Sequence, residues 1–212
     1  MKASYLKLHE QGELQKRIRH ARELLTPCRL CPRQCGVNRL NGDETGICGT
    51  GARAMVASFA PHFGEESPLV GTGGSGTIFF SHCNLLCIFC QNYEISHCHD
   101  HGKGRENDPQ QLAGIMIKLQ EQGCHNINFV TPSHVIPQII GALPFAIEKG
   151  LYLPLVYNSS GYDSLESLEL LKDIIDIYMP DFKFWNPEHA KQYAHAHDYP
   201  KFARLALKEM YE

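Results

Sequence analysis

The sequence lacks the features that mark several common classes of protein. Its longest apolar run, Ile136 to Ile147, is interrupted by polar residues, glycine and proline, and no run reaches the ~20 residues needed to span a bilayer. Positive charge is not in excess, since the net charge is −3, so we expect no binding to nucleic acid or to an acidic membrane. The N-terminal stretch has no apolar core followed by a cleavage site, which predicts a cytoplasmic protein without a secretory signal.

Cysteine, in contrast, is abundant, with nine residues in a chain of 212. In a reducing cytoplasm disulfides are not expected, so ligation of metal or of an iron–sulfur cluster is the better interpretation. Cys98 and Cys124 have no spaced partners and are interpreted as a loop thiol and a core thiol, and the histidine-rich stretch around Cys98 as a solvated loop. The other cysteines form two spaced groups: Cys28, Cys31, Cys35 and Cys48, and Cys83, Cys87 and Cys90.

The second group has the spacing C-x3-C-x2-C and directly follows the apolar stretch 77–80. Cys83, Cys87 and Cys90, called the triad below, can ligate three irons of a cubane cluster and leave the fourth iron open to a small molecule. A structural zinc site or inert buried thiols are the alternatives.

The triad, with Phe89 before its third cysteine and Gln91-Asn92 after it, resembles the signature of the radical S-adenosylmethionine (SAM) superfamily. Within it, the sequence is most similar to pyruvate formate-lyase-activating enzymes and their uncharacterised relatives. The resemblance implies a [4Fe-4S] cluster that chelates SAM, cleaves it reductively to a 5′-deoxyadenosyl radical and so abstracts hydrogen from an unknown substrate, possibly a glycyl-radical protein. It also implies an enzyme of oxidoreductase or lyase type, and a reductant such as flavodoxin or ferredoxin.

The chain is long enough for one full core and a small appendage. Residues 1–75 are predicted to hold a helix (9–25) and a loop-rich, cysteine-rich region, and residues 76–212 to form the core. There, short apolar runs alternate with helical segments, which indicates parallel strands joined by crossovers. Strands are predicted at 77–80, 126–130, 153–157 and 174–179, and helices at 109–122, 133–149, 163–172, from 186 and from 200.

A closed eight-stranded barrel needs about 250 residues, so we predict an α/β fold with a partial (β/α) barrel of parallel strands. The superfamily core usually has six strands, and here the chain stops after the helices that follow the fourth. We therefore expect a C-terminally truncated or shortened version, because Glu212 stands where a fifth strand should follow.

Polar residues follow each predicted strand, at the end where parallel sheets collect their chemistry. By resemblance, Asn158, Ser159 and Ser160 would hydrogen-bond the ribose of SAM, and Phe89 belongs to the cofactor site. Thr131 and Ser133 stand where the superfamily usually has a Gly-Gly-Glu stretch that holds the methionine amino group. Ser133 has the alternative of a helix N-cap, and for the adjacent histidine a structural role is favoured.

Asp181 and Lys183 resemble the Asp-x-Lys segment of glycyl-radical activating enzymes, which implies a catalytic role. A cation there would steady the carboxylate of the cofactor or the charge that develops at sulfur. The alternative is a surface ion pair.

The N-terminal cysteine group fits zinc and a second iron–sulfur cluster equally well, and free thiols are the third interpretation. For the whole chain, the alternatives to an enzyme are a ferredoxin-like electron carrier and an inactive remnant stabilised by zinc or a cluster.

Overall fold

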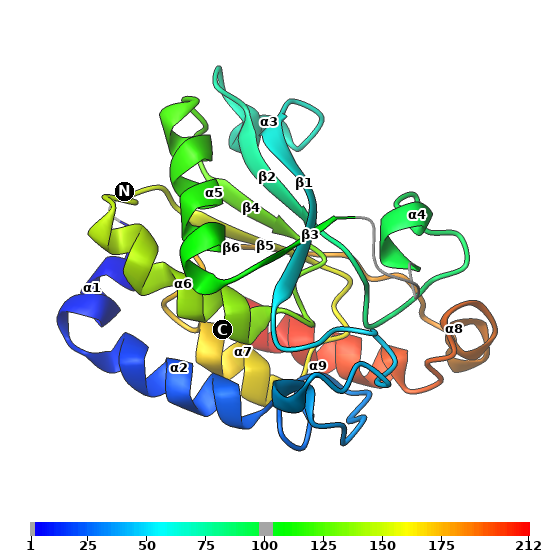
Figure 1. The fold of residues 1–212 in the computed structure, drawn as a ribbon. Coiled ribbons are helices and arrows are strands. Elements are labelled where there is room, and N and C mark those ends of the chain that lie inside the picture. The colour runs from blue at the N-terminus through cyan, green and yellow to red at the C-terminus, as the bar shows by residue number, and fades with distance from the viewer. Residues whose placement is uncertain (1–2, 98–103) are drawn as a thin grey trace.

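The computed structural model describes residues 3–97 and 104–212 (Figure 1), so Cys98 and the rest of the histidine-rich stretch after His97 lie outside the described residues. The fold is α/β, with a six-stranded mixed sheet in the order β3-β1-β2-β4-β5-β6. The four predicted strands are present and pair in parallel, as predicted. They are β2 (Ser75–Phe80), β4 (Ile127–Val130), β5 (Leu155–Ser159) and β6 (Ile177–Pro180). The sheet is open, with β3 and β6 at its edges.

Two antiparallel strands extend this sheet on the side of β2. They are β1 (Ala54–His62), which pairs with β2, and β3 (Arg105–Asn107), which pairs with β1. The prediction of loops throughout 26–75 is therefore wrong from residue 54 onward. A register shift lies between Val56 and Ser58, and the second half of β1 is half-buried to exposed, so only the first residues of the strand alternate with buried positions. The division of the chain at residue 75 stays a prediction.

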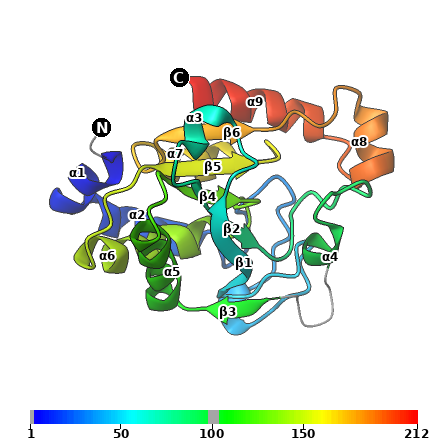
Figure 2. The same cartoon turned by 90° about the horizontal axis from the view of Figure 1, so that it is seen from above.

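Helices lie against the sheet and at its carboxyl end. The long crossover helices α5 and α6 pack together, α2 packs on α6, and Figure 2 shows them on the opposite side of the molecule from α4 and α8. The helices are α1 (Ser4–Glu10), α2 (Glu13–Glu23), α3 (Ser67–Val70), α4 (Tyr93–Ser96), α5 (Pro109–Glu121), α6 (Ile136–Glu148), α7 (Leu165–Leu171), α8 (Pro187–Ala194), α9 (Tyr199–Tyr211) and a 3-10 turn at Arg39–Asn41. Among the described residues, none of the helices has the length and apolarity required to cross a bilayer.

Local signals explain most helix boundaries. Asp108 caps α5 and forms a capping box with Gln111. The helix predicted at 9–25 is α2, which begins only at Glu13 because Gly12 before it adopts a φ of 72°; residues 4–10 form a separate helix, α1, that was not predicted. Helix α7, predicted from residue 163, begins at Leu165 and is capped by Ser164, and α6 begins after Val135, so Ser133 is not its cap.

Within residues 3–97 and 104–212, two groups of buried side chains make the core. The larger lies between the sheet and helices such as α5 and α6 and includes Ile78 and Phe129. The smaller lies beyond the carboxyl end of β2, where Cys83 and Cys87 pack with Tyr162 and Tyr199. The loop that carries the triad is therefore part of the packed interior.

Candidate functional site

The triad lies in the loop that leaves β2, and its three cysteines line one cavity of about 770 Å³. Cys83 and Cys87 are buried and Cys90 is half-buried. The backbone amide of Leu85 donates to Cys83 Sγ (3.3 Å), and the Ser96 hydroxyl donates to Cys90 Sγ (3.4 Å). Two of the three sulfurs thus already have hydrogen-bond donors of the kind that stabilise a thiolate.

The backbone around this site is strained. His82 and Leu86 in the triad loop have φ values of 70° and 57°, and Thr131, on the cavity wall, has 58°. Left-handed backbone costs a non-glycine residue roughly 1–2 kcal/mol, and a β-branched threonine is especially rare there. Such strain gathers at functional sites because the surrounding structure has to hold it in place.

Burial opposes the ionisation of two of the triad thiols. It raises the pKa of Cys83, and it raises the pKa of Cys87 to about 12, helped by the nearby Cys83 and opposed by the Lys183 ammonium. Binding of iron must therefore displace protons from these sulfurs. Lys183 lies close to the triad, since its ammonium lowers the pKa of Cys87 and both residues line the same cavity.

The carboxyl ends of the other parallel strands contribute to the same cavity. The sequence-predicted residues that line it beside the triad are Phe89, Thr131, Asn158, Ser159, Ser160, Asp181 and Lys183. Ser133 lies elsewhere, buried beside the Tyr157–Asp163 pair but without a well-formed hydrogen bond to it. The geometry therefore brings all predicted cofactor and catalytic residues except Ser133 to one place.

The two serine hydroxyls at the end of β5 differ in whether they are free to hydrogen-bond a ligand. Ser159 is engaged within the protein, since its hydroxyl donates to Asp163 Oδ2 (2.9 Å) and accepts from the Gly161 amide (3.1 Å). The Ser160 hydroxyl is buried and has no partner among the described residues. Ser160 is therefore better placed than Ser159 to bind a cofactor hydroxyl.

Asp163 holds the carboxyl end of β5 in place through the hydrogen bond from Ser159. Its carboxylate also accepts a hydrogen bond from the Tyr157 hydroxyl (2.7 Å), and burial raises its pKa despite these donors. Changing Asp163 to Ala should lower the free energy of unfolding by about 2 kcal/mol or more, because each unpaired buried polar group costs about 1–3 kcal/mol. Urea unfolding measures the loss. Asp163→Asn keeps one acceptor oxygen and should lose less, whereas an unchanged stability of the alanine variant would contradict the prediction.

The sequence interpretation missed three titratable residues of the cavity wall: His62 at the end of β1, and Glu65 and Glu66 in the connection that follows it. Burial raises the pKa of Glu65, and His62 opposes that rise. The available signal was the apolar pattern at 54–59, which would have identified β1 and with it the turn that follows.

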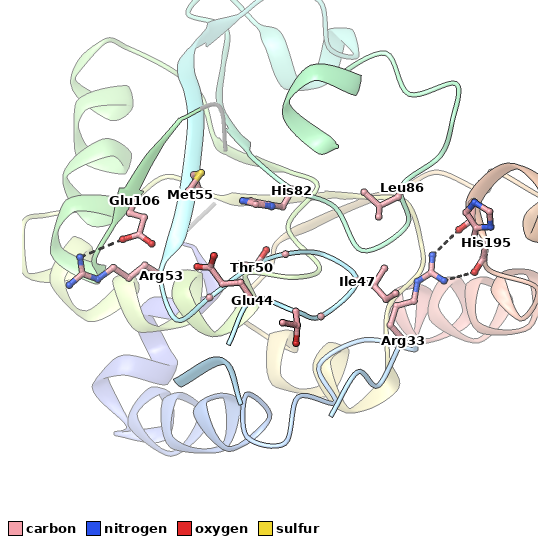
Figure 3. A pocket seen from close by; sticks show the side chains of 15 residues that line it. Arg33, Glu44, Ile47, Thr50, Arg53, Met55, His82, Leu86, Glu106 and His195 are labelled. Carbon is pink, nitrogen blue, oxygen red and sulfur yellow. Dashed lines mark hydrogen bonds and ion pairs between the residues drawn. The ribbon is translucent and has the colours of Figure 1, made fainter. Parts of the chain in front are cut away.

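A second cavity of about 930 Å³ also borders the triad loop (Figure 3). His82 and Leu86 line this second cavity, whereas Cys83, Leu85 and Cys87 line the first. The triad loop is therefore a wall shared by two cavities.

Arg33, from the cysteine-rich segment, holds this wall. Its guanidinium donates to the carbonyls of Asn84 (2.9 Å) and Leu85 (3.2 Å) in the triad loop and to Ala194 (2.8 Å) at the end of α8. Figure 3 shows the side chain reaching toward His195, whose carbonyl it also contacts. Arg33 thus joins the N-terminal segment, the triad loop and α8.

The N-terminal cysteines are also brought together. Cys28, Cys31, Cys35 and Cys48 line one narrow cavity of about 10 Å³. Within residues 3–97 and 104–212, no three His, Cys, Asp or Glu side chains converge tightly enough to form a ready-made site for one ion. This holds for the triad too, whose sulfurs would contact different irons of a cluster.

Comparison with known proteins identifies the family. The model of the Radical SAM superfamily matches residues 77–208, from β2 into α9. The chain belongs to the radical SAM superfamily. An uncharacterised protein of Methanocaldococcus jannaschii is 33 % identical over 198 residues, which cover 88 % of this chain and 54 % of that protein. The chain thus spans about half the length of this curated relative.

Membership in the radical SAM superfamily implies SAM-dependent radical chemistry with a [4Fe-4S] cluster. The residues present fit these groups. Three thiols face a cavity whose volume lies within the ~300–1,000 Å³ of typical small-molecule sites, and the Ser160 hydroxyl on its wall lacks a partner among the described residues.

Proposed function

We propose that this radical SAM protein is an enzyme that cleaves SAM reductively and abstracts hydrogen from a substrate, in the manner of the activating enzymes. The observation that carries the proposal is the shared cavity, in which the triad meets the polar ends of β4, β5 and β6. A ferredoxin-like carrier would have no use for such a cavity. Activation of a glycyl-radical protein, a flavodoxin or ferredoxin reductant and a cytoplasmic location belong to the same proposal.

Each group of residues has its own part in this function. The triad would hold three irons, and the bound cluster supplies the electron that cleaves the sulfonium of SAM. Asn158 and Ser160 would bind the ribose hydroxyls, while strained Thr131 would shape the wall opposite the triad loop. Because Ser159 is engaged with Asp163, its part is to position Asn158 and Ser160.

Asp181 and Lys183 are proposed as the charged pair that receives the amino-acid end of SAM. Their side chains form an ion pair with Nζ and Oδ2 2.5 Å apart, and the Tyr199 hydroxyl accepts from the Lys183 amide (2.7 Å). The ammonium is the less exposed partner, with 34 % of its side chain accessible against 62 % for Asp181. A lysine so held beside Cys87 would bind a carboxylate close to the triad.

The function is tested by anaerobic reconstitution with iron and sulfide, followed by reduction in the presence of SAM. Formation of 5′-deoxyadenosine is expected. A protein that assembles a redox-active cluster but yields no 5′-deoxyadenosine would be an electron carrier, and one that assembles no cluster would be a remnant.

Changing Asn158 or Ser160 to Ala should weaken SAM binding a few-fold to tenfold, since one neutral hydrogen bond contributes about 0.5–1.5 kcal/mol. Equilibrium dialysis of the reconstituted variants measures the dissociation constant. Their iron content should match the parent, because no cluster ligand is changed. Ser58→Ala, on the exposed part of β1, is the matched control, and parental affinity in both site variants would refute these contacts.

A further inference from the structure

The backbone of the cysteine-rich segment folds back on itself and gathers its four thiols. The Cys28 amide donates to the Val37 carbonyl (2.8 Å), and the Gly36 amide donates to the Cys28 carbonyl (2.9 Å). Cys48 arrives from the loop before β1, where the neighbouring Ile47 amide donates to Cys35 Sγ (3.4 Å). Cysteines that are far apart in this loop-rich segment thus border a single cavity.

A buried positive charge borders the same cavity. Arg39 is 1 % exposed and donates to carbonyls only, two bonds to Gly51 (3.0 and 3.1 Å) and one to His134 (2.9 Å). Among the described residues it forms no ion pair with a carboxylate. Burying an unpaired cation is costly, so an anionic group is expected close by. Neutral thiols do not supply that charge, whereas four metal-bound thiolates do.

His134 is a second independent sign. It lines the cavity, is 1 % exposed, and its Nε2 lies 2.9 Å from the Ser81 carbonyl. Nε2 therefore carries the hydrogen, and Nδ1 has a lone pair with no partner in the described part of the chain. An unpartnered buried acceptor is uncommon in a native structure and indicates that a group which the described chain does not supply belongs beside His134.

The size of the cavity decides what that occupant is. At about 10 Å³ it has room for one water-sized body, whereas the triad borders about 770 Å³. We propose that Cys28, Cys31, Cys35 and Cys48 bind one thiophilic divalent ion, with zinc the first choice, next to His134 and Arg39. Binding draws the sulfurs inward and releases the thiol protons to solvent, with no change of oxidation state.

The site would make the cysteine-rich segment a rigid support for the triad loop. Arg33 lies between Cys31 and Cys35 in the sequence and donates to the carbonyls of Asn84 and Leu85. Asn84 itself borders the thiol cavity. Metal at the N-terminal cysteines would thus fix the residues that lie between Cys83 and Cys87.

The test uses the full chain with Cys83, Cys87 and Cys90 changed to Ala, so that iron at the triad does not contribute. Metal analysis of the purified protein should find about one zinc per chain, the stoichiometry of a tetrathiolate site. Adding Cys31→Ser and Cys35→Ser should remove it. Adding Cys124→Ser, which changes a buried cysteine outside both groups, should leave it unchanged.

Cobalt gives a readout that needs no change at the N-terminal cysteines. Triad-variant protein produced with cobalt should show the ligand-field absorption of a tetrahedral thiolate site. Mononuclear iron in place of zinc would keep the site and change the metal assigned to it. Several irons with sulfide in the triad variant would overturn the single-ion proposal in favour of a second cluster. Neither metal nor a cobalt spectrum, or zinc retained after both serine changes, would also overturn it.

Discussion

Changing any one triad cysteine to alanine should abolish SAM cleavage, the largest effect we expect from a single substitution. Each sulfur would be the only protein ligand of one iron, so losing one leaves a second iron open and the cluster unstable. No other cysteine borders the triad cavity within the described chain, so none can replace the lost ligand. Cys87 is the first residue to test, because it is buried and its pKa is affected by the Lys183 ammonium.

The measurement is 5′-deoxyadenosine formed after anaerobic reconstitution, together with iron bound per chain. The parent should bind about four irons at the triad, and the variant should fall to background in both. Cys124→Ala, in the core between the sheet and α5, controls for the loss of a thiol. A triple alanine variant that still produced 5′-deoxyadenosine at the parental rate would exclude the triad as the cluster site.

The second large effect is expected from Arg33→Met. The change removes donors from the carbonyls of Asn84, Leu85 and Ala194 while keeping much of the side-chain volume. Hydrogen bonds to charged groups contribute about 1.5–3 kcal/mol each, but Arg33 is only half-buried, so we expect a total loss of about 2–4 kcal/mol in the free energy of unfolding. The triad loop should also hold several-fold less iron after reconstitution.

The variant Arg33→Lys tests whether the planar guanidinium or only its positive charge is needed. Lysine keeps the charge but cannot present the planar fork that contacts several carbonyls at once, so it should rescue little of either loss. Arg19→Met, on the exposed side of α2, is the matched control and should behave as the parent. If Arg33→Met kept parental stability and iron content, Arg33 would not hold the triad loop.

The sequence predicts this fold where hydrophobic patterns are local. The predicted ends of β2 and β4 lie within two residues of those observed, because each apolar run is bounded by turn residues. β6 was placed too early, since Ile174 and Ile175 are buried before the strand begins at Ile177. The strand itself is only half-buried to exposed, so apolarity alone points to the buried connection before it.

Some residues of the candidate site can likewise be predicted from local sequence, and others cannot. The spacing of the triad can be read directly, and so can polar residues at the ends of parallel strands. The position of Arg33 cannot, because it depends on contacts between distant segments. Ser159 shows the limit at a single residue: its type suits ribose binding, but the fold commits its hydroxyl to Asp163.

The contacts of Arg33 also bear on the order in which the molecule is assembled. Arg33 and Ala194 are separated by 161 positions, so their contact forms only after α8 has been synthesised and has docked. Contacts of such long range form late, since the intervening chain must first be ordered. The triad sulfurs leave the ribosome well before the loop that presents them is held in place. We therefore expect the triad loop to hold iron and sulfide only after α8 has folded.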